Sequence, residues 1–239
     1  MSFYSFFAAD YERIFPFREE VYRFLQSYAG EEGCRVLDVG CGPGHYCGRF
    51  AADGYVAAGI DLDRAMIDEA VRRYPAAGFR CLDMRDVDSV PGSIHCAYSI
   101  GNVAAHLRPD ELARFLGKVG GMLEPGGSWI MQVMNWDALA GMEAYEFPVR
   151  AIGREGGEAT FHRAYRFIER GTVLFSVSLK QAGRELFGEE ATLYPLTVRN
   201  YLDLHRKAGF TMVAICSDFT GKPLAEVPGS GLVMVFRKG

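Results

Sequence analysis

The chain has 239 residues, about half of them hydrophobic, which is enough to bury a sizeable core in one domain. Its net charge is −4 and it has no run of lysine or arginine, which argues against nucleic acid or an anionic membrane as its partner. No apolar stretch reaches the length of a membrane span, the N-terminus lacks the basic start of a secretory signal, and the six cysteines are scattered. We therefore expect a single cytoplasmic domain over residues 1–239.

The N-terminal segment, residues 1–30, carries many aromatic side chains between Phe3 and Phe17. Such a stretch is too apolar for a free tail. We expect it to form a lid over a ligand site, with Tyr4 and Tyr11 among the side chains that line this site. The alternative is that it covers the edge of a sheet.

A glycine-rich turn follows the first predicted strand. Residues 36–39 form a short apolar run that predicts a buried strand, and Gly40, Gly42 and Gly44 come directly after it. Alternating glycines let the backbone turn sharply and lie close to a ligand. A dinucleotide-binding turn requires its third glycine at position 45, where this chain has His45, so the turn departs from that pattern.

The second predicted strand, residues 55–61, ends on an acid. Asp61 lies about twenty residues after the first glycine, where α/β nucleotide sites place the carboxylate that binds the ribose hydroxyls. An amphipathic helix is predicted over residues 64–74, with Asp63 as its N-cap. Asp61 therefore either binds a ribose or only caps this segment.

Two further strands also end on polar or small residues. Residues 78–82 lead into Asp83, and residues 94–100 lead into Gly101 and Asn102. In a doubly wound sheet, ligands bind outside the carboxyl ends of the strands. The ends of four successive strands therefore predict one ligand site.

The period of the pattern changes in the second half of the chain. Residues 160–167 and 173–179 alternate around a turn at 169–171, which predicts an antiparallel hairpin within residues 145–183. The other predicted elements alternate as in a parallel sheet: helix 109–123, strand 128–134, helix 198–208, and strands 210–216 and 232–236.

The motif of Asp38 followed by G-x-G-x-G resembles motif I of the class I S-adenosylmethionine-dependent methyltransferases. Leu-Glu-Pro-Gly-Gly before the fifth strand and Ala-Gly-Phe before the sixth are similar to turns of the same family. Residues 99–102 with His106 also resemble small-molecule N-methyltransferases of the glycine and sarcosine type. The hairpin inserted before the last helix adds to this narrower resemblance.

The resemblance implies an α/β fold with a Rossmann-like, doubly wound sheet of seven mostly parallel strands. The expected strand order is 3-2-1-4-5-7-6, with strand 7 antiparallel and an inserted antiparallel β-hairpin. Residues 33–135 would form the cofactor-binding core and residues 195–239 the C-terminal helix and last two strands.

The resemblance also implies S-adenosylmethionine as cofactor and assigns residues to it. Asp61 would bind the ribose and Asp83 the adenine amino group, although Asp83 alternatively caps a turn. The other implied cofactor residues are Asp38, Gly40, Cys41, Gly42 and Gly44 at the turn, and Leu62, Met84 and Ile100 around the purine or simply in the core. His45 either approaches the methionine end of the cofactor or is a solvated residue of the first helical turn.

The acceptor end of the site has weaker signals. His106 is the best candidate base by its ordinary pKa, although the corresponding histidine in similar proteins is often structural. Asn102, Arg163 and Tyr165 join the two N-terminal tyrosines as candidate substrate-lining residues. No cluster of histidines or carboxylates predicts a metal site.

Absent motifs point to a small-molecule acceptor. The fourth strand ends neither in an Asn-Pro-Pro-Tyr turn, as in methylases of base amino groups, nor in a Pro-Cys pair. We expect a monomer or homodimer that methylates an amine nitrogen. The alternatives are a protein that binds S-adenosylmethionine without catalysis and a nicotinamide-dependent Rossmann oxidoreductase.

Overall fold

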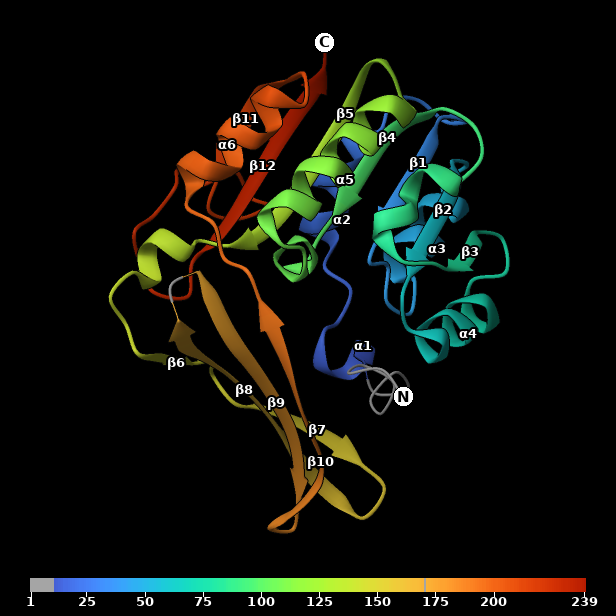
Figure 1. Ribbon diagram of the computed structural model, residues 1–239. Coiled ribbons are helices and arrows are strands. Elements are labelled where there is room, and N and C mark those ends of the chain that lie inside the picture. Colours follow the sequence, from blue (N-terminus) through green and yellow to red (C-terminus); the bar gives the residue numbers. More distant parts are fainter. Residues whose placement is uncertain (1–10, 170) are drawn as a thin grey trace.

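The computed structural model describes residues 11–169 and 171–239, and a seven-stranded sheet forms its centre (Figure 1). The strand order is β11-β12-β5-β4-β1-β2-β3, with β12 antiparallel to both of its neighbours. This confirms the predicted order 3-2-1-4-5-7-6. The strands are β1 (Arg35–Val39), β2 (Val56–Asp61), β3 (Gly78–Cys81), β4 (Ile94–Ser99), β5 (Leu123–Met134), β11 (Phe210–Cys216) and β12 (Gly231–Lys238).

Helices cover both faces of this sheet because its central strands are apolar on both sides. On one face, Tyr22 and Phe50 pack in a buried cluster with Tyr98 of β4. On the other face, Phe115 and Tyr201 pack around the buried Trp129 of β5. The helices are α2 (Glu19–Gln26), α3 (His45–Ala52), α4 (Arg64–Arg73), α5 (Pro109–Met122) and α6 (Val198–Lys207), with short 3-10 helices η2 (Met84–Ser89), η3 (Val103–His106) and η4 (Trp136–Leu139).

A second, antiparallel sheet projects from one end of the first, between β5 and α6 in the chain (Figure 1). The predicted hairpin is confirmed, since β8 pairs with β9. The sheet continues past residue 183, however, because β10 pairs with β9 through a turn at Ala182 and Gly183. Its strands are β6 (Ala144–Glu146), β7 (Arg150–Arg154), β8 (Gly157–Glu169), β9 (Thr172–Gln181) and β10 (Arg184–Leu193).

The short helix α1 (Tyr11–Ile14) lies between the two sheets (Figure 1). Ile14 is buried in a cluster that includes Met66 of α4 and both Ile152 and Phe161 of the second sheet. The chain after residue 10 therefore bridges the two parts of the fold. Residues 1–10, which include Tyr4, lie outside the described residues, so the lid expected there remains a prediction.

Two helical glycines give a matched test of packing in this fold. An alanine Cβ at Gly48 of α3 would lie 2.1 Å from Cδ1 of Tyr74, whereas one at Gly117 of α5 would meet nothing within 4 Å. Gly48→Ala is expected to lower the free energy of unfolding by about 1–2 kcal/mol, because overpacking outweighs the gain in helix propensity. Gly117→Ala is expected to raise it by about 0.5–1 kcal/mol. Urea unfolding of both variants checks this, and equal shifts would contradict the packing at Gly48.

Candidate active site

A cavity of about 590 Å³ opens at the carboxyl ends of β1, β2 and β4 and extends to the second sheet. Its position agrees with the rule that doubly wound sheets bind ligands at these strand ends. Twelve of the residues singled out in the sequence line it: Tyr11, Gly40, Gly42, Asp61, Leu62, Asp83, Met84, Ile100, Asn102, His106, Arg163 and Tyr165. The structure thus brings most of the predicted site into one space.

The Asp61 carboxylate is held by the backbone around it. Its Oδ2 accepts a hydrogen bond from the Gly42 amide (2.9 Å), and its Oδ1 accepts one from the Asp63 amide (2.9 Å). Burial raises the pKa of Asp61, and these two amides oppose that shift by stabilising the charged form. The carboxylate is therefore fixed in orientation at the wall of the cavity.

The glycine turn provides a flat backbone beside Asp61. Gly40 has a φ of +81°, and a Cβ there would lie 2.6 Å from a methyl group of Val103. At Gly42, with a φ of +52°, a Cβ would point toward the ring of Tyr11 at 3.6 Å. Only glycine combines this conformation with this space, so the turn can approach a ligand closely.

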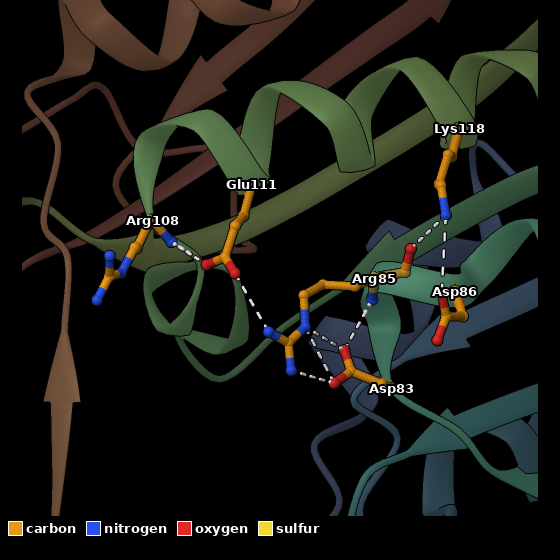
Figure 2. Close-up of polar contacts among 6 residues, drawn as sticks. All are labelled: Asp83, Arg85, Asp86, Arg108, Glu111 and Lys118. Atoms are coloured by element: carbon orange, nitrogen blue, oxygen red, sulfur yellow. Dashed lines mark hydrogen bonds and ion pairs between the residues drawn. The ribbon is translucent and has the colours of Figure 1, made fainter.

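Asp83 is oriented by Arg85, as Figure 2 shows. Nε of Arg85 lies 3.0 Å from both carboxylate oxygens, and the backbone amide of Arg85 donates to Oδ1 (2.9 Å). These bonds hold the pKa of Asp83 below its usual range. Arg85 also donates to Glu111 (3.1 Å), whose other oxygen accepts from the Arg108 amide at the start of α5. The ionised Asp83 carboxylate on the cavity wall is therefore linked, through Arg85 and Glu111, to the start of α5.

The structure does not place three of the predicted cofactor residues on the cavity wall. The Gly44 Cα faces Phe79, since a Cβ there would lie 2.6 Å from its ring. Cys41 is buried against β2, where a Cβ on Gly59 would meet its sulfur at 2.8 Å. Asp38 is only 2% exposed, beneath the turn. These three residues support the turn by packing and do not line the cavity.

His45 lies neither on the cavity wall nor in solvent. Its ring packs against Tyr46, with centroids 4.4 Å apart, and against Phe17 at 6.2 Å. Burial lowers its pKa to about 4. His45 therefore serves the packing of the N-terminal segment on α3.

The burial of Asp38 predicts a pH-dependent stability. Desolvation raises its pKa to about 8, so the folded state binds a proton that the unfolded chain releases near pH 4. The free energy of unfolding should therefore fall by about 1.4 kcal/mol per pH unit from about pH 4 to pH 8 because of this group. Asp38→Asn is expected to remove that slope in urea unfolding across the same range. The exposed Asp88→Asn serves as the control, and an unchanged slope in Asp38→Asn would contradict the assignment.

The other end of the cavity is built from the turn after β4. Asn102 has a φ of +68°, its Oδ1 accepts from the Met134 amide (3.0 Å), and its Nδ2 donates to the Tyr165 hydroxyl (3.2 Å). The Gly101 amide donates to Oε1 of Gln132 (2.6 Å). These bonds fix the turn against β5 and against β8 of the second sheet.

His106 ends η3 and lines the same part of the cavity. Burial lowers its pKa below the ordinary value, so the ring is neutral at pH 7. A neutral imidazole accepts a proton, which keeps His106 in place as the candidate base.

Several residues of the cavity wall were not predicted from the sequence. The period-two alternation of β8 puts Phe161 on the same face as Arg163 and Tyr165, and this signal was available. The others had no local signal because their strands and turns become neighbours only in the folded chain: Phe15, Val103, Gln132, Met134, Phe147, Arg150 and Phe175.

Residues 11–169 and 171–239, the described part of the chain, contain no group of three or more histidine, cysteine, aspartate or glutamate side chains arranged to hold a metal ion. They also contain no helix with the length and hydrophobicity that crossing a membrane requires.

Comparison with known proteins identifies the family. Residues 36–127 match the family described as "Methyltransferase domain". The chain is 31% identical over 211 residues to a dTDP-4-amino-2,3,4,6-tetradeoxy-D-glucose N,N-dimethyltransferase of Saccharopolyspora spinosa, an alignment that covers 86% of this chain and 80% of that protein.

Solved structures share the whole fold. An S-adenosylmethionine-dependent methyltransferase from Clostridium acetobutylicum superimposes with a TM-score of 0.79 at 14% identity, over 100% of both chains. An amino pentose methyltransferase from Micromonospora echinaspora gives a TM-score of 0.75 at 21% identity, over 100% of this chain and 98% of that one. With the strand order, the glycine turn and the acids at the strand ends, these likenesses place the chain in one family. It belongs to the class I S-adenosylmethionine-dependent methyltransferases.

Proposed function

We propose that the protein transfers a methyl group from S-adenosylmethionine to an amine nitrogen of a small molecule, with amino sugars as the first acceptors to test. One observation carries the proposal: a single cavity joins the acids at the ends of β2 and β3 to Asn102, His106 and Tyr165. The relative from Saccharopolyspora spinosa is named as an N,N-dimethyltransferase of an amino sugar, which supports the choice of acceptor.

The residues at one end of the cavity fit the cofactor. We assign the ribose hydroxyls to Asp61, whose orientation is fixed, and the adenine amino group to Asp83, which is ionised. The apolar side chains of Leu62, Met84 and Ile100 would bind the purine. The backbone at the glycines of the turn, which carry no side chains, leaves space for the rest of the cofactor.

When bound, S-adenosylmethionine supplies an already activated sulfonium methyl group, so the protein chiefly has to position the acceptor. Asn102 and Tyr165 present an amide and a hydroxyl at the acceptor end. The second sheet and α1 close the cavity from the side and limit the access of water. His106 would take the proton that the amine loses.

The test is formation of S-adenosylhomocysteine with a panel of acceptors. The panel contains amino sugars with and without a phosphate group, other amines, hydroxyl and thiol compounds, RNA, DNA and protein. We expect product only with small amines, and kcat/KM that rises with pH as the free amine forms. Methylation confined to hydroxyl or thiol compounds or to macromolecules would overturn the proposal, as would cofactor binding without any product.

A further inference from the structure

Two arginines line the part of the cavity that the second sheet forms. Arg150 on β7 is paired across the strands with Phe161 on β8, and Arg163 lies two residues further along β8. Side chains two residues apart on a strand share a face, so both guanidinium groups belong to the same wall. Most of their neighbours on this wall are aromatic.

Aromatic rings hold the two guanidinium groups. The Arg150 Cζ lies 5.0 Å from the centroid of Phe15, and the Arg163 Cζ lies 5.4 Å from the same centroid. Arg163 also lies over Phe147, with its Cζ 4.4 Å from that centroid. Contact with a ring face supports a guanidinium while leaving the N–H groups at its edge available for hydrogen bonds.

Neither arginine has a carboxylate partner in the described part of the chain. No aspartate or glutamate described there lies within 4.0 Å of Arg150 or Arg163. Arg150 donates to the Ile14 carbonyl, but the Arg163 guanidinium makes no hydrogen bond to the described residues and its Nε is buried. A second hollow that Arg163 borders is lined by glutamates, and none of them forms an ion pair with it.

The carboxylates of the described residues therefore leave the charge of this wall uncompensated. Burial lowers the pKa of Arg163 to about 10, and the neighbouring positive charge of Arg150 adds to the shift. Both groups nevertheless stay positive at neutral pH. Arg150 is exposed, whereas Arg163 is partly buried and its Nε is fully buried. A partly buried charge without a carboxylate partner is costly, and a ligand of opposite charge lowers that cost.

We propose that Arg150 and Arg163 bind an anionic group, a phosphate or a carboxylate, on the methyl acceptor. The inference rests on the proposed function, because it assigns the second end of the same acceptor. Tyr165, which is bonded to Asn102, lies two residues beyond Arg163 on β8, and two residues of a strand span about 7 Å. The backbone positions of Arg163 and Tyr165 are therefore about 7 Å apart, which puts the anion site next to the end of the cavity that receives the amine.

Binding of simple anions tests the site without turnover. Calorimetry with inorganic pyrophosphate and with malonate shows whether the parent protein binds a phosphate or a carboxylate. We expect one of them to bind and to raise the Tm, and Arg163→Gln to weaken that affinity at least tenfold. Arg163→Lys keeps the charge without the planar fork and should retain part of the affinity, so the test survives if Arg163→Gln does not fold. The control is Arg166→Gln, an exposed position of β8 off the cavity wall.

A second experiment measures KM during turnover. With one amine offered with and without its anionic group, Arg163→Gln should raise KM for the anionic acceptor ten- to a hundredfold and leave KM for the neutral one unchanged. Failure of both anions to bind the parent, or equal binding by Arg163→Gln and Arg166→Gln, would overturn the inference while leaving amine methylation intact. Anion binding that depends on Arg163, with no product from any amine, would count against the proposed function instead.

Discussion

Replacing His106 with alanine is expected to lower kcat by about 10²–10⁴-fold with the amine acceptor, the range that general bases contribute. In the proposed role, His106 lines the acceptor end of the cavity and would accept the proton that the amine loses. Burial lowers its pKa, which keeps the ring in the neutral form that this role needs at pH 7. Steady-state rates of S-adenosylhomocysteine formation measure the loss. At pH values where the acceptor is fully unprotonated, the variant should recover most of its activity.

Two variants separate catalysis from packing at this position. His106→Gln fills similar space without a base, so it should lose about as much activity as alanine does. His162→Ala is the control, because this histidine bonds to Thr160 on β8 and lies off the wall of the main cavity. A loss below tenfold in both His106 variants would make the residue structural and would leave deprotonation of the amine to solvent.

Asp61→Ala is expected to weaken S-adenosylmethionine binding by about ten- to a hundredfold, since hydrogen bonds to a charged group contribute about 1.5–3 kcal/mol. The carboxylate also accepts from the Gly42 and Asp63 amides, so its loss frees the glycine turn as well. Calorimetric titration with S-adenosylmethionine measures the effect.

Controls for this variant exclude a general loss of folding. Asp68→Ala removes an exposed acid of α4 whose one ion pair among the described residues is with Arg64, and it should bind the cofactor like the parent. The thermal unfolding of Asp61→Ala without cofactor should remain cooperative. If Asp61→Ala binds S-adenosylmethionine as tightly as the parent does, the assignment of the ribose to this residue is wrong.

The seven-stranded sheet was predictable from the sequence because each strand and helix carries its own local signal. The helix N-cap at Asp63 is one example, since its side chain accepts from the amides of Ala65 and Met66 as predicted. The acids and glycines at the strand ends were predictable for the same reason. A parallel sheet brings these ends to one edge whatever the rest of the chain does.

The extent of the second sheet was not predictable in the same way. β10 follows a tight turn in which Ala182 has a φ of +49° and Gly183 one of +77°. Such turns usually carry asparagine or aspartate before the glycine, so alanine concealed the hairpin. Arg150 and Phe15 reach the cavity only through long-range packing of β7 and α1, which no local pattern encodes.

A sequence does not distinguish residues that line a ligand site from residues that only support the turn beside it. Asp38 and Gly44 stand in the motif beside Gly40 and Gly42, yet only the latter two line the cavity. The difference depends on which way each residue of the turn faces after folding. Alternating glycines cannot reveal this, because residue spacing does not show on which side the helix closes.

One continuous stretch of the chain forms the second sheet, and it is separate from the stretch that matches the methyltransferase family. The chain leaves the seven-stranded sheet after β5 and returns at α6, where the Val198 amide donates to Asp137 (3.0 Å). The stretch that matches the methyltransferase family, residues 36–127, ends before this excursion begins. In the proposed function, substitutions within this insertion can therefore change one wall of the acceptor end while the strand ends at the cofactor end stay unchanged. A graft of this insertion between relatives would exchange the part of the cavity wall that the second sheet forms and keep Asn102 and His106, so it would measure how much of the acceptor choice the second sheet determines.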